Sequence, residues 1–453
     1  MERKKLGIYV HIPFCVKKCL YCDFLSDKGN AEEKTQYIDA LLKEIEYYGL
    51  DDSDFSSQYE VATVFLGGGT PSILNPDVIG RILQTISDRF VMAKAPEITI
   101  ECNPGTVTKE KLQVWKESGV NRISIGLQSA NDDELEHLGR IHRLEEFLET
   151  YSQAREVGFT NINIDLMSAI PGQTLESYRN TLKKVLELKP EHISSYSLIV
   201  EEETPFYDIY GDEKQAMAAV NLKGEIVPLS EVGKMGVMSM PDLPDEDTER
   251  EMYYLTEELL REHGYHRYEI SNYSLDGFEC AHNKSYWDGT DYIGFGIGAA
   301  SYVKGIRYSN TEDFYKYINA CKTKGVAQNQ PYYVGAGDFD EDDDYSYEET
   351  QSARSLTREE FGQILLAEKY HEAIQLISAN EQMEEFMYLG LRMIKGISKQ
   401  EFFNRFHINI EDIYGKQIEK LIGEELLVSD GDSIALTAKG IDVSNRVLAN
   451  FLL

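Results

Sequence analysis

Long apolar runs are missing from this sequence of 453 residues. No uninterrupted stretch approaches the roughly 18 apolar residues that a membrane-spanning helix needs. The first five residues lead straight into a short strand-like run, without the apolar segment and small-residue cleavage site of a secretory signal. We therefore expect a cytoplasmic protein with no integral membrane segment.

Basic residues are scarce. The chain has 45 Lys and Arg against 78 Asp and Glu, a formal net charge of -33 at pH 7. A field of this sign repels nucleic acid phosphates and anionic lipids, so we expect no nucleic acid partner. The apolar share of 42% and the charged share of 27% are close to ordinary globular values, which excludes a wholly disordered chain.

Cysteine is rare and unevenly placed. Of six cysteines, Cys15, Cys19 and Cys22 lie within eight residues, and the other three are scattered. This is no disulfide framework for a chain of this length. Clustered thiols in a reducing compartment indicate a metal site.

Short β-branched runs alternate with amphipathic helix patterns through the first 205 residues. The predicted strands are Gly7 to Ile12, Val61 to Leu66, Glu97 to Cys102, Arg122 to Leu127, Asn161 to Leu166 and His192 to Leu198. The predicted helices between them are Asn30 to Ile45, Asp77 to Phe90, Lys109 to Ser118, Leu144 to Val157 and Leu175 to Leu188. Strands joined through helices pair in parallel, so the pattern predicts an α/β fold.

The position of polar residues favours a barrel over an open doubly wound sheet. Polar or glycine-rich groups stand at the carboxyl ends of several different strands, at Gly67 to Pro71, Glu101, Gln128 and Asp165. A TIM-like barrel gathers its site from several such ends, whereas an open sheet binds ligands at one switch point. We predict a closed or partial (β/α)6 barrel.

Composition divides the chain into four predicted parts: a core barrel over residues 1–240, with an insertion at 211–240; a barrel extension over 241–335; an acidic loop over 336–357; and a C-terminal domain over 358–453. The loop includes Asp338 to Glu349, with eight acids in twelve residues, a composition typical of a solvated segment.

In the C-terminal part, three amphipathic stretches precede two apolar runs joined by Asp430-Gly431. Helices followed by a two-stranded hairpin predict a winged-helix-like domain. Its 8 basic and 11 acidic residues from Met383 onward favour a packing or docking role over DNA binding.

The cysteine motif Cys15-x3-Cys19-x2-Cys22 follows the first predicted strand. Three thiolates on a short loop can bind three corners of an iron-sulfur cube and leave the fourth iron open to a small chelating ligand. The alternative is structural zinc, which needs four protein ligands, with His11 as the fourth. The cysteine spacing favours the cluster.

The motif, with an aromatic residue before its third cysteine, resembles the signature of radical S-adenosylmethionine (SAM) proteins. Tyr9-x-His-Ile-Pro-Phe-Cys15 is similar to the branch shared by oxygen-independent coproporphyrinogen III dehydrogenases and HemW haem chaperones. Further segments agree in order and spacing: Phe65 to Pro71, Ile100 to Pro104, Arg122 to Ser129, Leu138 to Arg140, Asn163 to Leu166 and Pro171 to Thr174. The resemblance covers nearly the whole chain and implies a radical SAM barrel with a HemN-type C-terminal domain.

The resemblance also implies the cofactors and their residues. Cys15, Cys19 and Cys22 would hold a [4Fe-4S] cluster, and the open iron would chelate SAM. The residues that match SAM-side positions are Tyr9, Tyr21, Gly68, Gly69, Thr70, Glu101, Gln128, Arg140 and Asp165. Glycine permits close approach of a ligand to the backbone, and the mixed charges suit a zwitterionic, cationic ligand. No residue is assigned a catalytic role.

Three features place the chain on the HemW side of this branch. The dehydrogenases have a fourth cysteine two residues after the third, where this chain has Phe24, and a longer segment ahead of the motif. His282-Asn-Lys-Ser-Tyr-Trp287 matches the His-Asn-x-x-Tyr-Trp motif of HemW proteins. An imidazole can ligate haem iron and aromatic rings can lie against a porphyrin, so His282 is the predicted haem ligand, with Cys280 as a second candidate.

The resemblance implies a haem chaperone that passes haem to haem-requiring acceptor proteins, with respiratory membrane proteins as the acceptor class. The cluster would cleave SAM or serve a structural or dimer-controlling role, and a homodimer is compatible with both. The alternative is a coproporphyrinogen III dehydrogenase, which decarboxylates a tetrapyrrole by radical chemistry. A third interpretation, a DNA-responsive regulator, is opposed by the acidic charge.

Overall fold

A twelve-stranded sheet forms the centre of the molecule in a computed structural model, which describes residues 3–48, 58–211, 219–221, 226–227, 237–323 and 370–452. Neighbouring strands follow the order β10-β11-β6-β5-β4-β3-β2-β1-β12-β13-β14-β15. The six predicted strands lie side by side in it as β1 (Lys4–Ile12), β2 (Tyr59–Gly68), β3 (Met92–Cys102), β4 (Arg122–Gln128), β5 (Ile162–Ser168) and β6 (His192–Ser197).

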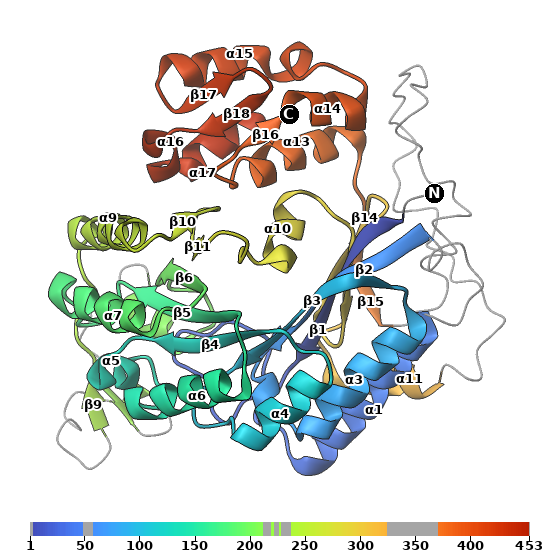
Figure 1. The fold of residues 1–453 in the computed structure, drawn as a ribbon, viewed down its shortest axis with the longest axis vertical. Helices are drawn as coiled ribbons and strands as arrows, with labels where there is room; N and C mark the ends of the chain where they lie inside the picture. Colours follow the sequence, from blue (N-terminus) through green and yellow to red (C-terminus); the bar gives the residue numbers. More distant parts are fainter. Residues whose placement is uncertain are drawn as a thin grey trace.

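These six strands are parallel and consecutive, so the predicted partial (β/α)6 barrel is confirmed. β1 and β6 are not partners of each other, because β1 pairs with β12 and β6 with β11. The connecting helices line one side of the sheet in Figure 1: α1 (Ala31–Tyr48), α3 (Pro76–Arg89), α4 (Lys109–Glu117), α6 (Leu144–Val157) and α7 (Leu175–Leu188). Because β1 and β6 do not pair with each other, the barrel is open.

Helix starts follow local capping chemistry. The Asn75 side chain accepts the amide of Asp77 at the start of α3, and Thr174 forms a capping box with Ser177 at the start of α7. Such side chains satisfy the first amides of a helix, which have no partner within it. The apolar faces of these helices then cover strands whose helix-facing residues, Ile8, Val64 and Ile125 among them, are fully buried.

The sheet continues beyond the six predicted strands. On one side, β12 (Tyr292–Phe295) is a seventh parallel strand beside β1, followed by antiparallel β13 (Ala300–Val303), β14 (Ile306–Asn310) and β15 (His371–Leu376). On the other, β11 (Asn272–Ser274) and β10 (His266–Arg267) run antiparallel after β6. The turn between β12 and β13 is rich in glycine, and Gly296 in it has a positive φ of 99°. Short α10 (Ala281–Trp287) carries the His282 motif.

The C-terminal unit has a hydrophobic core of its own, with Phe402, Tyr414 and Phe451 buried in it. Its helices are α13 (Ala379–Gly390), α14 (Lys399–Phe406), α15 (Ile410–Gly423), α16 (Ala438–Asp442) and α17 (Ser444–Leu448). β17 (Leu427–Asp430) and β18 (Ser433–Leu436) form the predicted hairpin around Gly431, which has a φ of 58°, and β16 (Ile397–Ser398) adds a third strand. This unit lies above α10 and the sheet in Figure 1.

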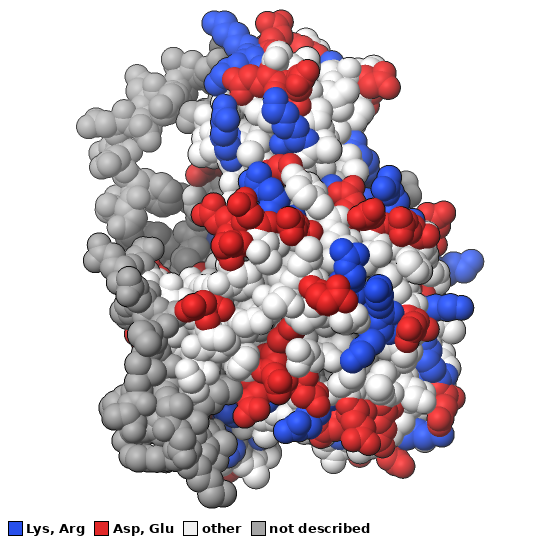
Figure 2. Space-filling model, turned by 90° about the vertical axis from the view of Figure 1, so that its left-hand side faces the viewer, with Lys and Arg blue, Asp and Glu red and all other residues white. Residues whose placement is uncertain are grey.

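Two predicted segments lie wholly or mostly outside the residues that the structure describes. The acidic loop at 336–357 lies outside the described residues, as does most of 211–240, of which β7 (Ala219–Asn221), β8 (Ile226–Val227) and β9 (Val237–Ser239) are described. In the described part of the chain, no helix has the length and apolarity to cross a membrane. On the face shown in Figure 2, the basic side chains of the C-terminal unit at the top stand among acidic ones.

Candidate functional site

The predicted site residues gather at the carboxyl ends of the parallel strands. The cysteine loop follows β1, Gly68 ends β2, and Gly69 and Thr70 follow it. Backbone hydrogen bonds tie the two segments together: the Gly69 amide donates to the Ile12 carbonyl over 2.9 Å, and the Thr70 amide to the Phe14 carbonyl over 2.8 Å. Adjacent parallel strands thus place the cysteines beside the glycine-rich turn.

The three cysteines are free and partly exposed. Cys15 Sγ lies 3.3 Å from Thr70 Oγ1, and Arg140 Nη1 donates to Cys19 Sγ over 3.6 Å. Burial, as the main cause, raises the pKa of Cys22 to about 11. Within the described residues, no group of three or more Cys, His, Asp or Glu is arranged to hold a single metal ion. The thiols share one loop, with hydroxyl and guanidinium groups beside two of them.

His11 is occupied by other contacts. Its Nε2 lies 2.8 Å from the Leu25 carbonyl and its Nδ1 lies 3.0 Å from the Tyr9 hydroxyl. Burial lowers the pKa of the ring, so the imidazole is neutral and one nitrogen donates while the other accepts. His11 therefore holds the cysteine loop, and the zinc alternative loses the fourth ligand on which it depended.

Arg140 crosses from the segment after α5 (Asp132–His137) to the other strand ends. Its Nη2 donates to Asn103 Oδ1 over 2.6 Å and to the Gly126 carbonyl over 2.8 Å, and Asn103 Nδ2 donates to Thr70 Oγ1 over 2.7 Å. Asn103 lies within the Ile100 to Pro104 motif and was not among the predicted site residues. Its amide links Thr70 to Arg140, so it belongs to the site.

Glu101 and Asp165 bring two carboxyl groups to neighbouring strand ends. Glu101 Oε2 accepts the Gly68 amide over 3.2 Å, while Asp165 accepts Ser124 Oγ over 2.9 Å and Asn163 Nδ2 over 2.8 Å. Burial first, and then the charge of Asp165, raise the pKa of Glu101 to about 8, and burial also raises the pKa of Asp165. The positive charge of Arg122 lowers both pKa values in part, and a cationic ligand beside the two carboxyl groups would favour their ionised forms further.

The remaining predicted SAM-side residues lie around this group. Gln128 ends β4 in the left-handed region, with a φ of 67°, where a residue other than glycine is uncommon and often functional. Tyr21 packs against Phe206, at 6.4 Å between ring centroids, and lies near the positive charge of Arg140. Tyr9 stacks on Phe65 at 6.4 Å. Each of these roles toward SAM stays a prediction.

The aromatic contacts of Tyr9 continue away from the cysteines. Phe65 stacks on His282 at 5.1 Å, and His282 meets the edge of Tyr286 at 5.1 Å. Tyr286 is followed by Tyr292 at 4.7 Å and Tyr302 at 6.3 Å. A continuous row of rings therefore joins the cysteine side of the barrel to the junction with the C-terminal unit.

His282 is 1% exposed on α10. Its Nδ1 lies 2.8 Å from Thr63 Oγ1 and its Nε2 3.0 Å from the Tyr286 hydroxyl. Burial, followed by the positive charge of Arg122, lowers the pKa of His282 to about 3, so the ring is neutral. Cys280 is fully buried, and its thiol faces Glu97 at 3.5 Å. Both predicted haem-ligand candidates are thus enclosed by protein contacts in this structure.

Comparison with known proteins identifies the family to which the chain belongs. Residues 9–185 match the Radical SAM superfamily and residues 377–443 match the HemN C-terminal domain. The curated protein "Heme chaperone HemW" of Lactococcus lactis is 32% identical over 453 residues, covering 100% of this chain and 99% of the relative. The chain belongs to the HemW family of radical SAM proteins. The predicted family is confirmed.

Other comparisons agree on the family and the fold. "Heme chaperone HemW" of Bacillus subtilis is 32% identical, over 98% of both chains. A solved structure described as "Coproporphyrinogen III oxidase (HemN) from Escherichia coli is a Radical SAM enzyme" superposes with a TM-score of 0.73 at 22% identity, over 99% of this chain and 90% of that one. At this identity the likeness shows the fold, and it covers both the HemW-family barrel and its C-terminal unit.

Proposed function

We propose that this protein is a haem chaperone, which binds haem and delivers it to haem-requiring proteins. The observation that carries the proposal is the full-length similarity to relatives named "Heme chaperone HemW". The motif from His282 to Trp287, on a helix against the barrel, supports it from the residues of this chain. Respiratory membrane proteins are the proposed acceptors and the cytoplasm the proposed compartment. A homodimer is part of the same proposal.

The donor set at the cysteine loop fits a [4Fe-4S] cluster. Cys15, Cys19 and Cys22 supply three thiolates, and Phe24, 62% exposed, stands where a further cysteine would follow. With His11 engaged elsewhere, one iron of a cluster held by these thiolates would have no ligand from this loop. Thr70 and Arg140 would donate to the sulfur atoms of Cys15 and Cys19.

The neighbouring strand ends fit SAM beside that open corner. Gly68 and Gly69 leave the backbone bare, with Thr70 next to them, and Glu101, Gln128, Arg140 and Asp165 would hold the polar groups of the ligand. Tyr9 and Tyr21 would contact the cluster side. A bound cluster with SAM supplies radical chemistry. These residues would position the ligand, and its cationic charge would favour the ionised carboxylates of Glu101 and Asp165, whose pKa values burial raises in its absence.

The alternative function is oxygen-independent oxidative decarboxylation of coproporphyrinogen III. The barrel shared with the HemN structure is compatible with it, but the curated full-length relatives cited above are named as haem chaperones, and Phe24 replaces the fourth cysteine expected of the dehydrogenases. The proposal therefore favours haem binding without porphyrin synthesis.

An anaerobic reconstitution tests the two functions against each other. The protein is loaded with iron and sulfide, supplied with SAM and reductant, and assayed for products from coproporphyrinogen III and for a Soret band on addition of haem. We expect stoichiometric haem binding and no protoporphyrinogen. Formation of protoporphyrinogen, or failure of the reconstituted protein to bind haem, would overturn the proposed function.

A further inference from the structure

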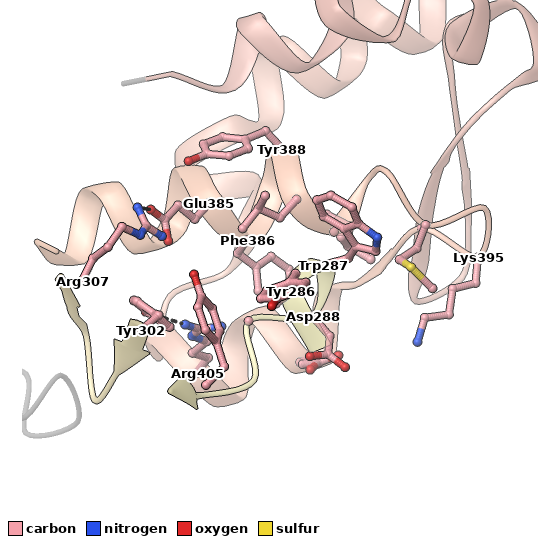
Figure 3. A pocket seen from close by; sticks show the side chains of 18 residues that line it. Tyr286, Trp287, Asp288, Tyr302, Arg307, Glu385, Phe386, Tyr388, Lys395 and Arg405 are labelled. Atoms are coloured by element: carbon pink, nitrogen blue, oxygen red, sulfur yellow. Dashed lines mark hydrogen bonds and ion pairs between the residues drawn. The ribbon is translucent and has the colours of Figure 1, made fainter. Parts of the chain in front are cut away.

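A cavity of about 320 Å³ lies where the barrel extension meets the C-terminal unit. Its walls come from α10, the strands β12 to β14, and the helices α13 and α14, as Figure 3 shows from close by. Ligand sites in proteins typically measure about 300 to 1,000 Å³. None of the residues predicted to hold the cluster or SAM lines this cavity. It is a separate candidate site of ligand size.

Aromatic side chains from both units form much of its wall. Tyr286, Trp287 and Tyr302 come from the barrel extension, and Phe386 and Tyr388 from α13. The Arg392 guanidinium lies 4.4 Å from the centroid of the Trp287 ring. Flat aromatic walls favour a planar aromatic ligand, which can stack on them or meet their edges.

Cationic groups of the cavity differ in whether they are neutralised. Arg307 pairs with Glu385 over 2.8 Å. Arg405 and Lys395 have no carboxylate within ion-pair distance among the residues that the structure describes. They stand apart from each other in Figure 3. Asp288 and Glu401 also line the cavity, and Asp291 interacts with Arg405 electrostatically. Two separated cations that form no ion pair still favour a ligand with two carboxylate groups.

Arg405 is held in the cavity by contacts that leave most of its donors free. Its Nη2 lies 3.5 Å from the Tyr302 hydroxyl. A Cβ at Gly289, whose φ is 69°, would lie 2.8 Å from Arg405 Nη1, so this glycine lets the guanidinium reach across the junction. A guanidinium has five N–H donors, and a single neutral acceptor satisfies only a small part of them.

We propose that this cavity binds a planar aromatic dicarboxylate, with its rings against Trp287 and Tyr302 and its carboxylates at Arg405 and Lys395. This inference rests on the proposed function, because it identifies the ligand as haem and assigns half of its site to the C-terminal unit. The cavity is lined by Tyr286 but not by His282, so His282 would reach iron there only after the Tyr286 side chain moved aside.

Haem titrations of charge variants test the proposal. Arg405→Gln and Lys395→Gln each remove one cation, and we expect each to raise the dissociation constant for haem about tenfold, the effect of losing one charge-assisted hydrogen bond. Arg446→Gln, which removes an arginine with a 70% exposed side chain on α17, is the matched control and keeps the parent affinity. Circular dichroism melting confirms that each variant is folded.

Haem dimethyl ester, which lacks both carboxylates, provides the second measurement. The parent binds it more weakly than haem, and Arg405→Gln binds it no worse than the parent does, because the interaction with the carboxylate is already absent. Equal haem affinity in the parent, Arg405→Gln and Lys395→Gln would overturn the inference and leave the proposed function standing. Absence of haem binding by the parent itself would instead overturn the proposed function.

Discussion

His282 Nε2 lies 3.0 Å from the hydroxyl of Tyr286, four residues later on the same short helix. The other ring nitrogen meets Thr63 Oγ1 at 2.8 Å, so the imidazole bridges β2 and α10. For His282 to ligate haem iron, its contact with Tyr286 has to break. If Nε2 is the nitrogen that binds iron, the Tyr286 hydroxyl would compete with iron for it.

The first prediction concerns His282→Ala. If His282 is the axial ligand, its loss shifts the visible spectrum of bound haem and weakens binding. The measurement is an absorption titration of the reconstituted protein, with His263→Ala, an exposed histidine on the surface, as control. An unchanged spectrum and affinity in His282→Ala would remove His282 as the ligand.

The second prediction concerns Arg140. Its guanidinium contacts Cys19, Asn103 and the Gly126 carbonyl, and a lysine cannot reproduce this fork. Arg140→Lys should weaken SAM binding about tenfold, as expected for one lost charge-assisted hydrogen bond. Isothermal titration calorimetry under anaerobic conditions measures it. Arg143→Lys, on a 70% exposed side chain, is the control, and equal affinities in both variants would contradict the role of Arg140.

The third prediction is a pH dependence of stability set by Glu101. Burial and Asp165 raise the pKa of Glu101 to about 8, above its ordinary value of 4.5. The folded protein therefore favours the protonated carboxyl, whose contribution to the free energy of unfolding is complete below pH 4.5 and is lost as the pH rises to 8. Glu101→Gln resembles the protonated form at every pH.

We expect the ligand-free Glu101→Gln variant to melt at a higher temperature than the parent at pH 8.5, with the difference shrinking toward pH 5. The same variant should bind SAM more weakly, because a cationic ligand favours the ionised form of Glu101 and glutamine cannot ionise. Thermal melts across this pH range check the first effect and calorimetry the second. A pH-independent difference between the two melting temperatures would show that Glu101 does not titrate as described.

The sequence predicted the six barrel strands because each combines a buried apolar run with a following helix. β12 was missed: it has only four residues, one of them glycine, and its place beside β1 depends on long-range pairing. The same limit applies to side chains. Motif spacing selected Arg140 and Thr70, but that Asn103 joins them depends on three strand ends meeting in space. Likewise, no pattern could show that His282 faces Thr63.

The last prediction tests the close contact between the glycine-rich turn and the cysteine loop. A Cβ at Gly69 would lie 2.8 Å from the Phe14 carbonyl oxygen and 2.9 Å from that of Ile12, and backbone atoms cannot move aside as a flexible side chain can. Gly69→Ala should therefore separate Thr70 from Cys15, destabilise the fold by about 1 to 3 kcal/mol and lower the iron and sulfide content after reconstitution. Gly423→Ala is the control, since a Cβ there meets nothing within 4 Å at the end of α15 and should leave stability equal or slightly higher. Chemical denaturation and iron analysis measure both variants. Full cluster content in Gly69→Ala would mean that the turn need not touch the cysteine loop for the cluster to assemble.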